Sequence, residues 1–173
     1  QTCALPISEG LGWPTGVALW KNGVFVAAAP DLWYLEDSDG DGKADVRKVV
    51  LTGFGKGNVQ GLVNGLIWGV DHRIYIASAS NGGVIRNPAE PSASAVSVSG
   101  SDGRFDPRDG SLATDSGSAQ YGHCFDDWYR RYVCSNSDHA QEIVFPSRYV
   151  RSEEHTSELP SHSDLVCRLL LEK

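Results

Sequence analysis

Three short apolar segments near the start of the chain determine the fold class: Gly16-Val-Ala-Leu-Trp20, Val24-Phe-Val-Ala-Ala28 and Leu32-Trp-Tyr-Leu35. Short turns separate them, and Lys21-Asn-Gly23 is the first of these turns. Short runs of aliphatic, β-branched and aromatic residues that are bounded by turn residues are typical of β-strands. We therefore expect three consecutive strands over residues 16–35.

The same arrangement recurs twice further along the chain, each time opened by a glycine. The second copy comprises Gly65-Leu-Ile-Trp-Gly69, Ile74-Tyr-Ile-Ala-Ser78 and Gly83-Val-Ile85, and the third comprises Gly122-His-Cys-Phe-Asp126, Arg131-Tyr-Val-Cys-Ser135 and Glu142-Ile-Val-Phe145. Repeats of about 40–50 residues that contain several short strands indicate the blades of a propeller. The predicted fold class is all-β, a partial β-propeller of about three blades. Residues 88–101, rich in Ser, Pro and Ala, are expected to form a loop.

The two ends of the chain have a separate origin in this interpretation. Residues 1–7, Gln-Thr-Cys-Ala-Leu-Pro-Ile, can be encoded by one short oligonucleotide. The reverse complement of that oligonucleotide, preceded by one adenine, encodes residues 151–157, Arg-Ser-Glu-Glu-His-Thr-Ser. This relation resembles read-through of a sequencing-library adapter. We therefore predict adapter-derived residues 1–7, a β-propeller fragment of metagenomic type over residues 8–150, and adapter-derived residues 151–173.

The composition argues against two classes of partner. The chain has 15 Lys and Arg residues against 22 Asp and Glu residues, a formal net charge of −7, and residues 8–150 are also acidic. An acidic chain offers no basic stripe for nucleic acid and no basic face for a membrane. No apolar run approaches the roughly 18–20 residues of a membrane span. We expect neither nucleic-acid binding nor direct membrane insertion by this fragment.

The strongest chemical signal is the loop Asp37-Ser-Asp-Gly-Asp-Gly-Lys-Ala-Asp45. Calcium takes about 6–8 oxygen ligands at roughly 2.3–2.6 Å, and alternate carboxylates on a tightly turning loop can converge on one ion. We predict a calcium site in which Asp37, Asp39 and Asp41 supply side-chain oxygens. In the same site Lys43 supplies its backbone carbonyl, and Asp45 binds directly or through water.

The loop differs from the calcium loop of helix-loop-helix proteins. Lys48 occupies the twelfth position, where that motif needs a bidentate Glu. The flanking residues 31–36 and 46–52 are rich in β-branched or aromatic residues, so we expect the loop to join two strands. The alternative is a solvated acidic turn without metal, since Asp and Gly are common turn residues. Against it, four carboxylates so close together repel one another unless a cation neutralises them.

Several segments together resemble one known family: residues 14–35, 37–45, 58–69, 105–107, 121–128 and 134–139. They are similar to the membrane-bound dehydrogenase β-propellers of planctomycetes and verrucomicrobia, which are related to glucose/sorbosone dehydrogenases. The resemblance covers nearly all of residues 12–149. It implies a six-bladed parent propeller exported to the periplasm, in some cases membrane-anchored. It also implies a frequent downstream cytochrome c domain that holds haem c through Cys-x-x-Cys-His, a motif that this sequence lacks.

The resemblance implies a catalytic histidine that this chain does not have. In the related sugar dehydrogenases, a histidine takes the proton of the substrate hydroxyl while pyrroloquinoline quinone accepts hydride. Family members with this histidine carry it, followed by Arg, just before Val-Asn-Gly, but here Gly61 and Leu62 precede Val63-Asn-Gly65. Glycine has no proton-accepting side chain, so this mechanism cannot run through position 61.

Two weaker candidates for a catalytic role remain, His139 and Asn64. His139 follows Asp138, but neighbours in an extended chain point apart, so a structural histidine is the favoured interpretation. Asn64 could point into a central channel or brace the backbone beside Gly65. Neither residue has the sequence context that would assign it a defined catalytic role.

The other histidines and the cysteines have structural interpretations. His72 lies in a predicted hairpin turn, and His123 follows the glycine of the third repeat. Cys124 and Cys134 flank one predicted hairpin and would form a disulfide only if their strands place them opposite each other. An exported protein would meet the oxidising conditions that such a bond requires.

Three classes of function follow from these observations. The resemblance favours a dehydrogenase that uses calcium and pyrroloquinoline quinone to oxidise a sugar or an alcohol. The second class is a non-catalytic propeller that binds carbohydrate or protein. The third is a calcium-stabilised structural module of a larger electron-transfer protein with a cytochrome c domain. A fold does not carry its chemistry automatically, so all three stay open at this point.

Overall fold

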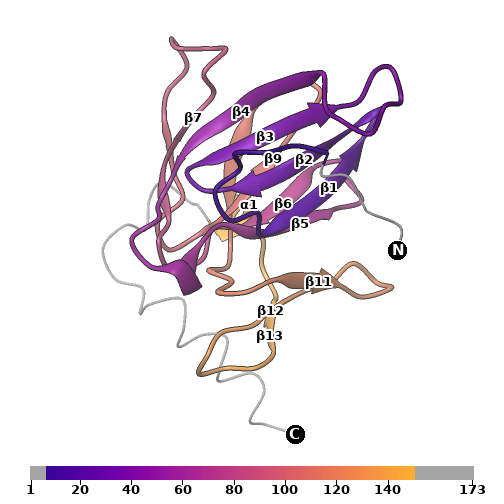
Figure 1. Ribbon diagram of the computed structural model, residues 1–173. Coiled ribbons are helices and arrows are strands. Elements are labelled where there is room, and N and C mark those ends of the chain that lie inside the picture. The colour runs from indigo at the N-terminus through magenta and orange to yellow at the C-terminus, as the bar shows by residue number, and fades with distance from the viewer. Residues whose placement is uncertain (1–6, 151–173) are drawn as a thin grey trace, which may run out of the picture.

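Three antiparallel sheets make up the computed structural model, which describes residues 7–150 (Figure 1). The predicted all-β class is confirmed. Two short helical turns accompany the sheets: η1 (Val59–Gly61) and α1 (Ser147–Val150). Within residues 7–150, no helix has both the length and the apolar character needed to cross a membrane. The segments 1–6 and 151–173 lie outside the described residues, so their adapter origin stays a prediction.

The first sheet has six strands in the order β1-β2-β3-β4-β7-β8. Their bounds are β1 Gly16–Trp20, β2 Gly23–Ala28, β3 Asp31–Glu36, β4 Val46–Phe54, β7 Gly83–Arg86 and β8 Val96–Ser97. The first three are the strands expected from the opening sequence pattern. Their register aligns Val17 with Val26 and Val26 with Trp33, which places these side chains on one face of the sheet.

The other two sheets are smaller. The second sheet has the order β10-β9-β6-β5, with β10 Leu112–Asp115, β9 Asp102–Phe105, β6 Ile74–Ala77 and β5 Asn64–Trp68. The third contains β11 His123–Phe125, β12 Arg131–Val133 and β13 Gln141–Ile143, and lies below the other two in the view of Figure 1. Each predicted repeat therefore begins with a hairpin that the structure contains.

One predicted strand belongs to a different sheet from the one expected. Residues 83–85 are part of β7, which pairs with β4 of the first sheet, whereas β6 pairs with β9. The physical reason lies in packing, because Ile85 is buried in the same core as Leu51 and Phe54. A Cβ on Gly53 would lie 2.2 Å from the carbonyl oxygen of Val84, so only glycine permits this close approach of β4 and β7.

The segment 88–101 was expected to be a loop, and the structure corrects this in part. Residues 96–97 form β8, which extends the first sheet by pairing with β7, with Ile85 aligned to Val96. The next residue, Val98, is fully buried. Residues 88–95 connect β7 to β8, residues 98–101 lead from β8 to β9, and neither stretch contains a strand.

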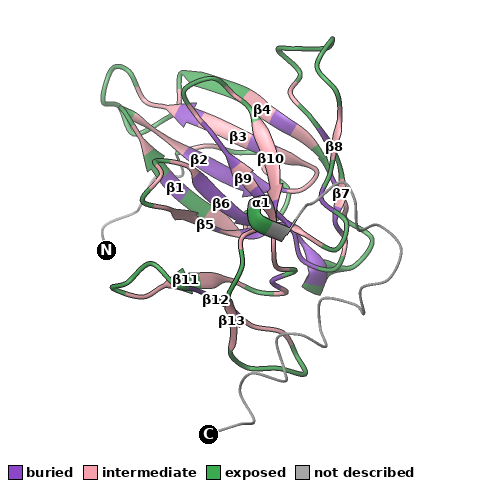
Figure 2. Cartoon of the chain, turned by 180° about the vertical axis from the view of Figure 1, so that it is seen from behind, coloured by how far each residue is buried: buried purple, intermediate pink, exposed green. Residues whose placement is uncertain are grey.

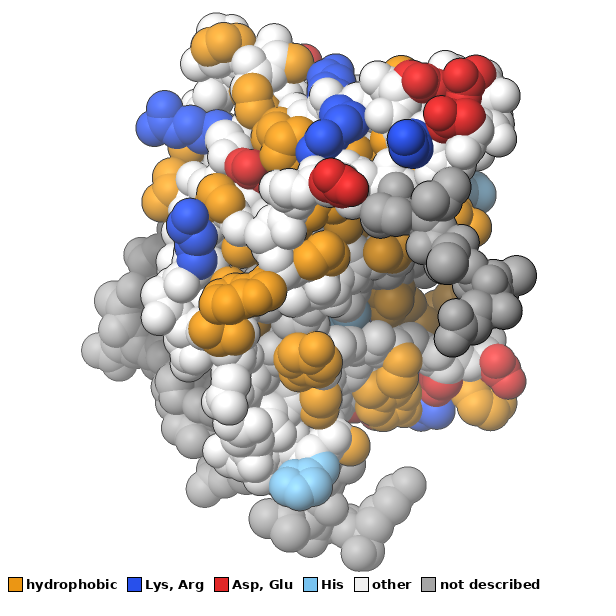
Figure 3. Space-filling view, in the orientation of Figure 1, with side chains coloured by type: hydrophobic (Ala, Val, Ile, Leu, Met, Phe, Trp, Pro, Cys, Tyr) orange, Lys and Arg blue, Asp and Glu red, His pale blue; other side chains and the backbone are white. Residues whose placement is uncertain are grey.

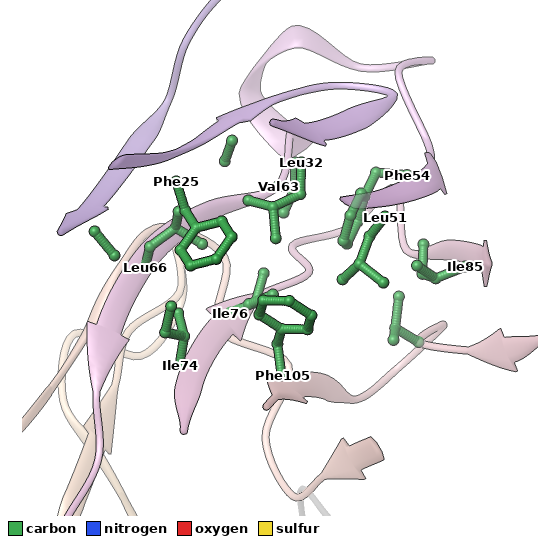
Figure 4. Close-up of a cluster of buried hydrophobic side chains, with 13 residues drawn as sticks. Phe25, Leu32, Leu51, Phe54, Val63, Leu66, Ile74, Ile76, Ile85 and Phe105 are labelled. Carbon is green, nitrogen blue, oxygen red and sulfur yellow. The ribbon is translucent and has the colours of Figure 1, made fainter. Parts of the chain in front are cut away.

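The main core lies between the first and second sheets (Figure 4). Its aromatic centre is the edge-to-face contact of Phe25 in β2 with Phe105 in β9, whose ring centroids are 5.4 Å apart. Leu32, Ile74 and Ile76 are fully buried around these rings. In Figure 2 the buried residues gather on the central strands of these two sheets. The sheets therefore hold together chiefly by apolar burial.

The glycines that open the repeats lie where the sheets meet. A Cβ on Gly16 would come within 3.3 Å of the backbone nitrogen of Gly65, and a Cβ on Gly65 would come within 3.1 Å of the Cα of Gly122. Thr15 Oγ1 donates a hydrogen bond to the Val63 carbonyl at this junction. The first strands of the three sheets, β1, β5 and β11, are thus close neighbours although they belong to separate sheets.

Truncation of Phe105 should destabilise the fold strongly. Phe105→Ala removes a buried ring from the core, and a cavity of this kind costs about 3–5 kcal/mol of unfolding free energy. Leu19→Ala is the matched control, because Leu19 is 75% exposed, and exposed substitutions stay within about 0.5 kcal/mol. Urea unfolding followed by circular dichroism measures both. Equal losses in the two variants would contradict the assigned core.

Candidate functional site

The acidic loop lies at one end of the hairpin formed by β3 and β4. Glu36 pairs with Val46, and this pair closes the loop that contains residues 37–45. Its aspartates form a group of acidic side chains at the upper right of Figure 3, on the exposed surface. The two flanking strands therefore fix where the loop begins and ends, as the sequence predicts.

Hydrogen bonds from the loop backbone orient its carboxylates. Asp37 accepts hydrogen bonds from the backbone N–H groups of Gly40 and Gly42, at 2.7 and 2.9 Å. Both glycines have positive φ values, 81° and 87°, which let the chain curl around Asp37. At the other end, the backbone N–H and the hydroxyl of Ser38 both donate to Asp45, at 2.9 and 2.7 Å.

Three of the predicted carboxylate ligands come together. Asp37, Asp39 and Asp45 each offer an oxygen atom, and these oxygens all lie within 4.8 Å of one another. This separation is about twice a calcium–oxygen distance of roughly 2.4 Å, so a single ion could contact all three. Asp41 lies outside this group, and its carboxylate accepts a hydrogen bond from the Lys43 N–H at 2.7 Å. The ligand roles of Asp41 and of the Lys43 carbonyl stay predictions.

The carboxylates of the loop form no ion pair with a described basic side chain. The hydrogen bonds from Ser38 lower the pKa of Asp45 and so favour its ionised form. Among residues 7–150, the ion pairs involve other aspartates, and none includes a carboxylate of this loop. Carboxylate oxygens are the type of ligand that hard cations such as Ca²⁺ take.

The position expected to carry the catalytic histidine has no side chain to contribute. Gly61 is buried at the end of η1, and its carbonyl accepts a hydrogen bond from Asn81 at 3.3 Å. Asn58 and Asn81 join the two segments beside Gly61. The Asn81 side chain donates to the Asn58 carbonyl at 2.7 Å and accepts from the Asn58 N–H at 3.0 Å. Position 61 therefore has no side chain that could accept a proton.

Asn64 is occupied with structural hydrogen bonds. Its side chain is 1% exposed, and its amide nitrogen donates to the carbonyls of Leu62 and Gln120, at 2.8 and 3.2 Å. Its amide oxygen accepts from the Gly122 N–H at 2.7 Å. The residue thus joins β5 to the segment that leads into β11. This arrangement favours the bracing interpretation over a catalytic one.

The three described histidines lie in different surroundings. His139 and His72 are exposed, and His72 occupies the β5–β6 turn with a φ of 57°. His123 is half-buried in β11, where its Nε2 hydrogen bonds with the Gly65 carbonyl. Burial and the neighbouring Arg131 lower the pKa of His123 to about 4. His123 therefore serves as a neutral structural residue at the junction of two sheets.

Sequence reasoning missed a buried ionic cluster between the second and third sheets. Arg131 in β12 forms ion pairs with Asp102 and, at 3.6 Å, with Asp115. All three residues are at most 5% exposed. Burial raises the pKa of Asp102 to about 6, although Arg131 opposes this shift. Asp102 and Arg131 are 29 residues apart and lie in unremarkable local sequence, so no signal in the sequence distinguishes the pair.

The strand register does not place the two cysteines opposite each other. Cys124 is aligned with Tyr132, and Cys134 lies beyond the end of β12. Both thiols are free, and Cys134 Sγ contacts the Tyr121 carbonyl at 3.0 Å. Diagonal neighbours in an antiparallel pair have Cα atoms about 7–8 Å apart, which exceeds the span of a disulfide.

One family model matches this chain, and its description is Domain of unknown function (DUF7133). The match spans residues 7–168 and so continues past residue 150 into the segment predicted to be adapter-derived. No curated protein and no solved structure matches the chain.

Replacing Asn64 should reduce stability. Asn64→Ala leaves the Gly122 N–H and two carbonyl groups without their partner, and each buried unsatisfied group costs about 1–3 kcal/mol. We expect a total loss of at least about 3 kcal/mol. His139→Ala should leave stability unchanged because His139 is exposed. Chemical denaturation of both variants tests this, and an Asn64→Ala variant as stable as His139→Ala would refute the bracing role.

Proposed function

This chain belongs to the family described as Domain of unknown function (DUF7133), and we propose that it is a calcium-stabilised structural module of an exported, dehydrogenase-like β-propeller. The observation that carries the proposal is the convergence of Asp37, Asp39 and Asp45 at one end of the β3–β4 hairpin. The neighbouring positions of β1, β5 and β11 support an arrangement of sheets as successive blades, with these strands innermost.

Calcium fits the loop better than magnesium does. Magnesium requires near-ideal octahedral geometry at about 2.0–2.1 Å, whereas calcium accepts irregular sets of oxygen ligands. Asp37, Asp39 and Asp45 lie on an irregular loop; Asp39 and Asp45 are exposed and Asp37 is half-buried, which leaves room for water to complete the coordination. The calcium sites of extracellular modules bind at about 10⁻⁴–10⁻³ M, and we expect an affinity in this range.

Positions 61 and 64 do not fit the proton-abstraction step of quinone-linked oxidation. Gly61 offers no base, and the amide of Asn64 is committed to backbone groups. We therefore propose no catalytic step through pyrroloquinoline quinone within residues 7–150. Oxidation of a sugar or alcohol by the parent protein, and electron transfer to a cytochrome c domain, would have to rely on other residues.

Binding of calcium to the native state should raise the melting temperature. A ligand present at 100 times its Kd stabilises the folded state by about 2.7 kcal/mol, which corresponds to roughly 5–10 °C for a domain of this size. Asp39→Asn should remove most of this shift. Asp127→Asn, which neutralises an exposed aspartate outside the loop, should retain it.

The measurement is differential scanning calorimetry with and without calcium, together with titration calorimetry for the binding itself. Magnesium at the same concentration should give a smaller shift. An equal calcium shift in the Asp39→Asn and Asp127→Asn variants, or no shift for the unmodified chain at about 10 mM calcium, would refute the proposed site.

A further inference from the structure

The three sheets contact one another through equivalent strand positions. The register identifies these positions, because the first hairpin of each sheet aligns a residue of its first strand with an aromatic residue of its second: Ala18 with Phe25, Ile67 with Tyr75, and Cys124 with Tyr132. Side chains alternate between the two faces of a strand. We call the face that includes this aromatic residue the forward face of the sheet, and the other the rear face.

The forward face of each sheet packs on the rear face of the next sheet along the chain. Phe25 meets Phe105 of the second sheet edge-on, with ring centroids 5.4 Å apart. Tyr75 meets Phe125 of the third sheet in the same way, at 5.1 Å. By their register, Phe105 and Phe125 both lie on rear faces. The two successive interfaces therefore follow one rule.

The rear face of the first sheet is open along β1. Val17 and Leu19 lie on this face and are 58% and 75% exposed. The residue at the position of Leu19 in the second sheet is Trp68, which packs against Trp20 of the first sheet with ring centroids 5.4 Å apart. Leu66, on the same face as Trp68, is buried in the main core. The β1 positions are thus an apolar packing surface without the sheet that the rule provides.

The chain itself covers another part of this rear face. Leu35 and Val26 lie on it and are buried, and Arg47, aligned with Leu35, donates to the Glu9 carbonyl at 2.7 Å. The uncovered part is therefore the one along β1. This is the strand through which the first sheet approaches the second most closely, at Gly16.

The forward face of the third sheet is open as well. Cys124 is exposed, and Tyr132 and Cys134 are half-buried. In Figure 2 strands β11–β13 appear mainly in the intermediate and exposed colours. A ring between two small side chains is also the composition of the forward face that the first sheet buries against the second, which consists of Ala18, Phe25 and Ala27. The third sheet therefore presents a surface of the type that packs on a rear face.

We propose that two copies of this chain associate head to tail, with the third sheet of each copy packed on the first sheet of the other. Leu19 then meets Tyr132 of the second copy, as Phe125 meets Tyr75 within one copy. Contacts of this heterologous kind close into a ring when the rotation permits. Two copies supply six sheets, which lies within the about 4–8 blades of closed propellers, whereas three copies supply nine.

Charges favour this arrangement over one that pairs two like faces. The rear face of the first sheet carries the exposed Arg47, and the forward face of the third carries Glu142, aligned with Tyr132. Arg130 beside them is neutralised by its ion pair with Asp126 at 2.7 Å. Head-to-tail contact joins faces of opposite charge, whereas contact between two first sheets brings two Arg47 side chains together. The calcium loop takes no part in either contact, so the outcome is independent of calcium binding.

Sedimentation velocity of the full 173-residue chain tests the proposal. Interfaces of standard size bind in the range from micromolar to picomolar, so the unmodified chain at about 100 µM should sediment as a dimer. Val17→Arg and Cys124→Arg each place an unpaired charge in both interfaces of the ring, so each variant alone should be monomeric. Val70→Arg is the matched control, because Val70 is 56% exposed in the β5–β6 turn, away from both faces, and this variant should stay dimeric.

An equal mixture of the Val17→Arg and Cys124→Arg chains tests the head-to-tail geometry. One interface of the mixed dimer contains both substitutions and the other contains neither, so the mixture should form dimers that neither variant forms alone. A monomeric unmodified chain, a Cys124→Arg variant that still dimerises, or a mixture no larger than its components would each overturn the proposal.

Circular dichroism checks that the variants fold, and Leu19→Gln and Cys124→Gln replace any variant that does not. Because dimers add to apparent stability, the unfolding of Leu19→Ala is compared at a concentration well below the dimer Kd.

Discussion

The close approach of β1, β5 and β11 is the constraint on which the rest of the structure depends. These strands share no hydrogen-bonded ladder, yet Gly16, Gly65 and Gly122 bring their backbones almost into contact. A side chain at Gly65 would push the sheets apart, so glycine is required there for packing and also for its φ of 59°. Side chains such as Thr15 and Asn64 then satisfy backbone groups that no neighbouring strand can reach.

The sequence predicts the local parts of this arrangement well because they depend on nearby residues. The recurrent glycines and the hairpins that follow them appear where the pattern places them. The strand that pairs with β7 could not be predicted in the same way. Residues 83–85 have the pattern of a strand, and this pattern fits a position beside β6 as well as one beside β4. What decides the matter is the fit of Ile85 beside Phe54 and the close approach at Gly53, and both depend on the folded backbone.

The same distinction applies to the candidate site. The convergence of Asp37, Asp39 and Asp45 could be predicted because nine consecutive residues contain it. The cluster of Asp102, Asp115 and Arg131 could not, because its members come from two sheets and each is an ordinary residue in its own segment. Buried ion pairs of this type depend on the surrounding desolvation, which a sequence pattern does not express.

The path of the chain between sheets has a consequence for biosynthesis. The chain leaves the first sheet after β4, builds β5 and β6 of the second, and returns to β4 only with β7. As the chain emerges from the ribosome, the outer edge of β4 stays without a strand partner until residues 83–86 have been made. An open edge beside the apolar Leu51 and Phe54 invites pairing with other nascent chains. The β4 edge is therefore open to strand addition from another chain until β7 has been made.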